Sequence, residues 1–179
     1  MTKTPDPQPS VGLAAGAADR GPVLVVHGGA GRYLDDARDD YVRGVDEALA
    51  AGLAVLDQGA EAAVLAAVVY LESHTIMNAG TGCTLAIDGT ARLDAGYMDG
   101  ATRRYGGVTG VMRCRNPVLL ARRASDDGEH GRLLGPPSCD ELALREDIAV
   151  CEPHELITER ARRLYEQRMA SAGAGAGQR

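Results

Sequence analysis

The chain has no phenylalanine and no tryptophan, and its only aromatic side chains besides four histidines are six tyrosines. Apolar residues still make up 45% of its 179 residues, so we expect a core built from small aliphatic side chains and tyrosine. The formal net charge is -6 and no cluster of Lys and Arg forms a basic stripe. This charge argues against nucleic acid or an anionic membrane surface as a partner, since both require clustered basic residues.

Long hydrophobic runs are also absent. The longest run, residues 62–71, is about half of what a bilayer span requires. The chain does not open with a basic segment followed by an apolar one, as a signal peptide does. We therefore expect a cytoplasmic protein with no membrane partner.

The sequence offers no paired cysteine motif. Its four cysteines are widely spaced, without a C-x-x-C pair and without a histidine at metal-ligand spacing: Cys83, Cys114, Cys139 and Cys151. In a reducing compartment this spacing favours free, partly buried thiols over a zinc site or a disulfide framework.

Both ends of the chain have low complexity. Residues 1–21 are rich in Pro, Ala, Gly and Asp and show no hydrophobic period, which predicts a flexible N-terminal extension. Residues 172–179 alternate Ala and Gly before Gln178-Arg179, which predicts a flexible tail. One domain is expected between them, over residues 22–171, and a chain of this length can build a core for it.

Hydrophobic patterns predict helices and short strands within this domain. Apolar residues recur at three- and four-residue steps in three expected helices, residues 41–56, 61–71 and 158–169. A further helix is expected from Pro117, with Asn116 as its N-cap. Short apolar or alternating runs predict strands at residues 23–26, 84–87, 91–97 and 107–112, the middle two joined by a two-residue type I′ hairpin turn at Asp88-Gly89. Residues 141–145 are ambiguous between helix and strand. The elements together predict an α+β fold in which helices flank mostly antiparallel strands.

Four short motifs follow one another between residues 23 and 121. They are Val25-Val26-His27-Gly28-Gly29-Ala30-Gly31, Met77-Asn78-Ala79-Gly80-Thr81-Gly82, Leu93-Asp94-Ala95-Gly96-Tyr97-Met98-Asp99-Gly100 and Arg115-Asn116-Pro117-Val118. Each motif alone is ordinary turn or helix-start chemistry. In this order they resemble the plant-type L-asparaginase and isoaspartyl peptidase family of N-terminal-nucleophile hydrolases.

That resemblance implies a fold made from two chains. Members of the family form a four-layer αββα sandwich, and this chain resembles the alpha subunit, the half that precedes the site of self-cleavage. The strands would then pair with those of a beta subunit, and the alpha subunit alone would expose an unsatisfied sheet edge.

The resemblance also implies where the nucleophile lies. In the family it is the threonine that begins the beta subunit, whose hydroxyl attacks a side-chain amide or isopeptide carbonyl. Its α-amine, with a pKa of about 7.7–8.0, acts as the base. The resulting acyl-enzyme is hydrolysed to aspartate and ammonia or an amino acid. The threonines of this chain are internal, apart from Thr2 behind the initiator Met, so the nucleophile would come from the partner.

Several residues inherit roles from the same resemblance. Asn78 would lie beside the partner's threonine and orient it, and Gly28 and Gly29 match a glycine loop near the active site. A structural sodium ion would be held by the backbone carbonyls of Leu71, Glu72, His74, Met77, Ala79 and Thr81. Hard cations prefer oxygen ligands, and carbonyls make few demands on side-chain identity. No organic cofactor is expected.

The sequence departs from the family pattern at three places. The family commonly has proline where this chain has Thr75, an aromatic residue where it has Met77, and a glycine-rich segment where it has Pro136-Pro137. Two prolines are expected to end regular structure there.

The leading hypothesis is the alpha subunit of an amidohydrolase in an (αβ)2 heterotetramer. Its substrate would be L-asparagine, a β-aspartyl dipeptide or a related small amide, and the sequence does not separate these. Two alternatives remain open at this point: a noncatalytic scaffold or regulatory subunit of the same fold, and a stand-alone small-molecule-binding domain.

Overall fold

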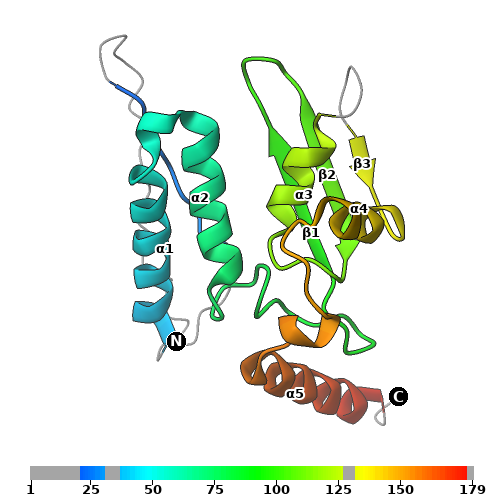
Figure 1. Cartoon of the computed structure of the whole chain (residues 1–179). Coiled ribbons are helices and arrows are strands. Elements are labelled where there is room, and N and C mark those ends of the chain that lie inside the picture. The colour runs from blue at the N-terminus through cyan, green and yellow to red at the C-terminus, as the bar shows by residue number, and fades with distance from the viewer. Residues whose placement is uncertain (1–20, 31–36, 127–131, 177–179) are drawn as a thin grey trace.

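The computed structural model describes residues 21–30, 37–126 and 132–176; residues 1–20 of the expected N-terminal extension, Gly31 and the last three residues lie outside these ranges. In the described residues five α-helices and two short 3₁₀ helices accompany three strands. In chain order they are α1 (Arg38–Leu53), η2 (Leu56–Gln58), α2 (Ala60–Ser73), β1 (Leu93–Met98), β2 (Tyr105–Val111), α3 (Pro117–Ala124), β3 (Arg132–Leu134), α4 (Ser138–Glu146), η3 (Pro153–Leu156) and α5 (Glu159–Ala176). Figure 1 shows α1 and α2 side by side on one flank, the sheet with α3 and α4 on the other, and α5 beneath the sheet.

Small residues let α1 and α2 pack closely. The buried positions of the two helices are mostly Gly and Ala, among them Gly52, Ala48, Ala63 and Ala67. A Cβ on Gly52 would lie 2.7 Å from the Ala63 carbonyl oxygen, so this contact requires glycine. The helices predicted over residues 41–56 and 61–71 are thus confirmed, with ends shifted by a few residues.

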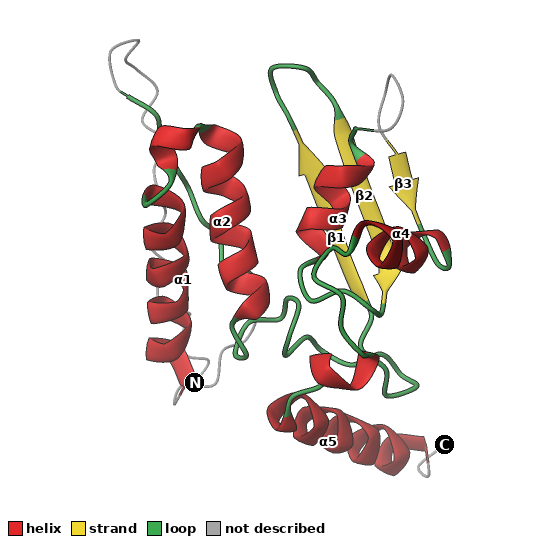
Figure 2. Cartoon of the chain, viewed as in Figure 1, coloured by secondary structure: helices red, strands yellow, loops and turns green. Residues whose placement is uncertain are grey.

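The sheet has the order β1-β2-β3, and α3 covers one of its faces (Figure 2). The pair β1–β2 is antiparallel and the pair β2–β3 is parallel. A Cβ on Gly106 would lie 2.0 Å from the Ala121 carbonyl oxygen, so α3 rests directly on β2. The core beneath it consists of Val, Leu, Ala and Cys side chains such as Val111 and Leu120, both 0% exposed. The core of small aliphatic side chains that the composition predicts is therefore present.

Two predicted strands are wrong. Residues 23–26 form no strand, and Val23 and Val25 are 80% and 74% exposed, because no described strand pairs with this segment. Residues 84–87 also form no strand. Their carbonyls are bound from α5 instead: Leu85 O accepts a hydrogen bond from Arg168, and Ile87 O accepts one from the Tyr165 hydroxyl.

A turn forms at this place, but it is not the two-residue type I′ turn expected at Asp88-Gly89, because only Gly89 of the pair has a positive φ, +77°. The Gly89 N–H donates to Ala86 O and the Ala86 N–H donates to Thr90 O, both at 2.9 Å. The Asp88 carboxylate accepts the N–H of Thr90 at 3.1 Å. Because residues 84–87 are bound to α5, the strand after this turn pairs with β2 rather than with the segment before it.

The C-terminal part is more helical than the sequence indicates. The ambiguous residues 141–145 lie in α4, which begins immediately after Pro136-Pro137. The Asp140 carboxylate in its first turn accepts the N–H groups of Met112 and Arg113 at 3.0 Å each. Helix α5 continues to Ala176, so residues 172–176 of the expected tail are helical. Alanine, the strongest helix former, alternates with glycine there.

All four cysteines are buried free thiols, as their spacing predicts. Burial raises the pKa of the Cys114 thiol to about 12, so it stays protonated at neutral pH. No helix in the described ranges is both long and apolar enough to cross a bilayer.

Candidate active site

A cavity of about 350 Å³ lies where the first glycine motif, α1 and the loop after α2 meet. It brings together residues from His27 to Ala79, which are 52 positions apart in the sequence. The lining consists of His27, Gly28, Gly29, Ala30, Tyr41, Leu71, Met77, Asn78 and Ala79. The three residues expected near the catalytic centre, Gly28, Gly29 and Asn78, thus share one cavity with three of the six expected cation ligands.

The two glycines of the first motif meet different constraints. Gly29 has φ +106°, a conformation that side chains disfavour, and its N–H donates to His27 Nδ1 at 3.2 Å. Gly28 allows close approach, because a Cβ there would lie 2.5 Å from a methyl carbon of Val45 on α1. The glycine loop is therefore held against α1 at the edge of the cavity.

The loop after α2 folds back onto the end of that helix. The Thr81 N–H donates to the Glu72 carbonyl at 2.8 Å, and the Met77 N–H donates to His74 O at 3.1 Å. Gly80 makes this closure possible: its φ is +50°, and a Cβ there would lie 2.1 Å from the Glu72 carbonyl oxygen. Residues 72–81 therefore form a closed ring of backbone.

The donors in this loop fit a hard cation bound by carbonyls. Leu71 O, Glu72 O and His74 O each accept one backbone hydrogen bond, which leaves a second lone pair on each oxygen. Side chains offer no alternative, since the described residues contain no group of three or more His, Cys, Asp or Glu that could hold a metal ion. The chemistry of the loop suits an ion such as sodium, and that ligand set remains a prediction.

Asn78 is oriented by the chain that follows it. Its Oδ1 accepts the Thr84 N–H at 2.7 Å. The NH2 group of the same amide can act only as a donor. Asn78 is exposed at the cavity wall, so this donor can reach a group that enters the cavity.

The residue expected to cap α3 does something else. Asn116 occupies the N-cap position, but its Nδ2 donates to Val69 O and to Ser73 Oγ, both at 3.3 Å. The cap is Glu72, whose Oε1 accepts the Val118 N–H at 3.0 Å. The prediction that the Asn116 side chain caps α3 is thus wrong, because the Glu72 carboxylate from α2 binds the first turn of α3 instead.

Sequence reasoning missed the Glu72 side chain. It is 4% exposed, its Oε2 has no hydrogen-bond partner, and burial raises the pKa of the carboxyl to about 7. One signal was available in the sequence: Glu72 directly follows the apolar run of residues 62–71, where α2 is most buried.

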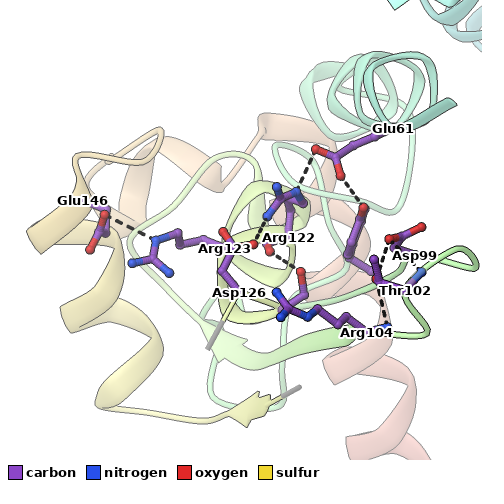
Figure 3. Close-up of polar contacts among 10 residues, drawn as sticks. Glu61, Asp99, Thr102, Arg104, Arg122, Arg123, Asp126 and Glu146 are labelled. Atoms are coloured by element: carbon purple, nitrogen blue, oxygen red, sulfur yellow. Dashed lines mark hydrogen bonds and ion pairs between the residues drawn. The ribbon is translucent and has the colours of Figure 1, made fainter. Parts of the chain in front are cut away.

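The motif of residues 93–100 stabilises the sheet and its contact with α2. The Asp94 carboxylate accepts the Thr109 hydroxyl and the Gly110 N–H, and these bonds lower the pKa of Asp94. Tyr97 donates its hydroxyl to Glu61 on α2, which also accepts Arg122 Nε at 2.9 Å. Figure 3 shows Glu61 reaching across to Arg122 on α3. Asp94, Tyr97 and Glu61 do not line the cavity of about 350 Å³.

The cavity lining contains no nucleophile of the usual kinds. None of its residues is Ser, Thr, Cys or Lys. Among side chains that can form covalent intermediates, this lining offers only His27 and Tyr41.

Comparison with known proteins gives a consistent result. A family model described as Asparaginase matches residues 20–176. The chain is 37% identical over 146 residues to the isoaspartyl peptidase/L-asparaginase of Xenopus laevis, covering 80% of this chain and 47% of that protein. It is 36% identical over 156 residues to the plant-type L-asparaginase of Pyrobaculum calidifontis, covering 85% of this chain and 51% of that protein. It is 34% identical over 160 residues to the isoaspartyl peptidase of Salmonella typhimurium, covering 86% of this chain and 50% of that protein. The chain spans about half the length of these curated relatives.

Proposed function

The chain belongs to the asparaginase family, and from that premise we propose that it is the alpha subunit of an amidohydrolase. Its substrates are L-asparagine, β-aspartyl dipeptides or both. The observation that carries the proposal is the cavity shared by Gly28, Gly29 and Asn78, whose lining contains the Asn78 amide but no Ser, Thr, Cys or Lys. The relatives' printed names, asparaginase and isoaspartyl peptidase, support the substrate class.

The missing nucleophile is the N-terminal threonine of a beta subunit. Its hydroxyl oxygen attacks the amide carbonyl while its own α-amine takes the hydroxyl proton. The C–N bond then breaks, the leaving amine takes that proton, and an ester joins threonine to the aspartyl group. Water hydrolyses the ester to release aspartate. In this scheme Asn78 donates its amide N–H to the threonine and fixes the direction of attack.

We expect the second chain to pack on the open face of the sheet. One face of the sheet is covered by α3, whereas Met98 and Leu133 near the sheet are 68% and 72% exposed. Gly96 has no atom within 4 Å of its missing Cβ. We expect this open surface to meet the strands of the beta subunit in a four-layer αββα arrangement, in an (αβ)2 heterotetramer.

The loop of residues 71–81 holds sodium in this proposal. The carbonyls of Leu71, Glu72, His74, Met77, Ala79 and Thr81 are the ligands. When bound, the ion would supply positive charge that the partial negative charge of these carbonyl oxygens stabilises. The loop in turn fixes the backbone around Asn78, which is one of its residues.

The experiment is N-terminal sequencing and intact mass of any chain that co-purifies with this one from its native source. A partner that begins with Thr, in a complex that hydrolyses asparagine or a β-aspartyl dipeptide, supports the proposal. A complex without such a threonine identifies a noncatalytic scaffold or regulatory subunit instead. A stable monomer that binds a small molecule with no partner identifies a stand-alone binding domain.

A further inference from the structure

Helix α5 reaches the loop that contains Asn78 through the Arg160 side chain. Arg160 lies in the first turn of α5 and is partly buried. Its Nη1 donates to the Ile76 carbonyl at 3.3 Å, and its Nη2 donates to the Tyr41 hydroxyl at 2.5 Å. The guanidinium carbon also lies 5.8 Å from the centre of the Tyr41 ring, within the range of a cation–π contact.

These two acceptors lie beside or in the wall of the candidate active site. Tyr41 lines the cavity from α1, and Ile76 is two residues before Asn78 in the closed loop. The Ile76 carbonyl is not one of the six that the cation would use. Arg160 therefore binds the loop without using any of the expected ligand carbonyls.

The chemistry of arginine suits this bridge. A guanidinium presents several N–H donors in one rigid plane and stays charged at every physiological pH. One side chain can therefore bind a carbonyl and a hydroxyl on two different elements and fix the distance between them. A lysine ammonium has no such fixed geometry, so a lysine is expected to preserve only part of the bridge.

We propose that Arg160 is a positioning residue of this site, which fixes Asn78 by tying the Ile76 carbonyl to Tyr41. In this role it acts through the loop and not by contact with substrate or nucleophile. The catalytic part of this inference rests on the proposed function, whereas the structural part does not.

The same helix offers a matched control. Arg168 is two turns further along α5, and its Nη2 donates to the Leu85 carbonyl at 2.7 Å. This bond also joins α5 to the preceding chain, but it ends outside the loop of residues 71–81. If Arg160 only anchors α5, replacing Arg168 should have the same effect.

The test compares Arg160→Met, Arg160→Lys and Arg168→Met in the full chain assembled with its partner. We expect Arg160→Met to lower kcat about 10- to 100-fold with little change in KM, since displacing an orienting group slows the chemical step. Arg160→Lys should lose less, and Arg168→Met, which releases a carbonyl one residue after Thr84, should lower kcat much less than Arg160→Met. Equal losses in Arg160→Met and Arg168→Met would overturn the proposal.

A second readout does not depend on catalysis. Hydrogen exchange of the Met77 and Thr81 amides reports closure of the loop, because both are hydrogen-bonded within it. We expect faster exchange at both amides in Arg160→Met and unchanged exchange in Arg168→Met. Unchanged exchange in Arg160→Met would overturn the positioning role.

Two further arms keep the inference testable. If Arg160→Met does not fold, Tyr41→Phe removes one acceptor and keeps the ring, and it should speed exchange at the same two amides to a smaller extent. No change at either amide would count against the bridge. If the wild-type complex hydrolyses neither substrate, the proposed function fails while the exchange result still decides the role of Arg160.

Discussion

The side chain of Glu72 at the end of α2 accepts the backbone N–H of Val118 in the first turn of α3, at 3.0 Å. The main-chain carbonyl of the same residue accepts the Thr81 N–H at 2.8 Å. One residue therefore fixes a helix start with its side chain and closes the candidate cation loop with its backbone. This junction joins the α1–α2 pair to the sheet side of the molecule.

Replacing Glu72 separates the hydrogen bond from the charge. Glu72→Ala leaves the buried Val118 N–H without an acceptor and opens a cavity, so we expect a loss of about 2–4 kcal/mol of unfolding free energy. Glu72→Gln keeps an acceptor and removes the buried charge, so its stability should lie within about 1 kcal/mol of wild type. Urea unfolding at pH 7 measures both. Equal losses in the two variants would show that the cap is not the important contact.

A second prediction concerns the backbone at Gly80. Gly80→Ala combines a positive φ with a Cβ 2.1 Å from the Glu72 carbonyl oxygen, so the loop must open to accept it. We expect a loss of about 2–4 kcal/mol, measured by thermal unfolding. The control is Gly100→Ala, in the turn after β1, where no atom lies within 4 Å and φ is not positive. That variant should change stability by less than about 1 kcal/mol, and a comparable loss there would refute the steric argument.

The sequence predicted well those parts of the fold that depend on neighbours along the chain. Helices α1 and α2 follow from apolar residues at three- and four-residue steps, and a turn at Asp88-Gly89, although not of the expected type, follows from local hydrogen bonding. The strand expected at residues 84–87 failed because Arg168 and Tyr165, far along the chain, bind the carbonyls of Leu85 and Ile87. A pattern within residues 84–87 cannot predict hydrogen bonds from side chains so far along the chain.

The candidate site divides in the same way. Its glycines and Asn78 stood out because glycine and asparagine motifs mark unusual backbone, and the structure places Gly28, Gly29 and Asn78 around one cavity. The Glu72 side chain and Arg160 were missed because their partners lie 46 and 84 residues away in the sequence. Each looked like an ordinary charged residue until the fold supplied its acceptor or donor.

Asn78 allows orientation and donation to be tested apart. Asn78→Asp keeps an oxygen for the Thr84 N–H but loses the amide donor, whereas Asn78→Ala loses both. We expect both variants to lower kcat or self-cleavage about 100-fold or more, while unfolding free energy falls by no more than about 1.5 kcal/mol. Steady-state kinetics and denaturant unfolding of the assembled protein check this. Wild-type rates in Asn78→Asp would remove the donor role.

Exchange of the cation tests the closed loop. Replacing sodium by a large organic cation such as tetramethylammonium, at constant ionic strength, should lower activity, because the ring of carbonyls cannot close around so large an ion. Restoring sodium should return the activity. Activity measured against sodium concentration gives the affinity. The same rate in both salts would contradict the assignment of a sodium ion to this loop.

Glu61 links acid stability to the contact between α2 and the sheet. Its carboxylate accepts the Tyr97 hydroxyl and the Arg122 guanidinium, and these two bonds hold its pKa below the usual 4.5. The unfolded chain therefore binds the proton more tightly than the folded one. The stability that this group contributes is complete above about pH 5 and is lost as the pH falls through the folded-state pKa.

We expect Glu61→Gln to reduce the slope of unfolding free energy against pH between about pH 5 and pH 3, measured by urea unfolding. Glu166→Gln, on the exposed side of α5, is the control and should keep the wild-type slope. Because Glu61 joins α2 to Tyr97 on β1 and to Arg122 on α3, the loss at low pH should appear first as increased amide exchange in α2. If Glu61→Gln and Glu166→Gln both follow the wild-type curve, the acid sensitivity of this protein arises at another carboxylate.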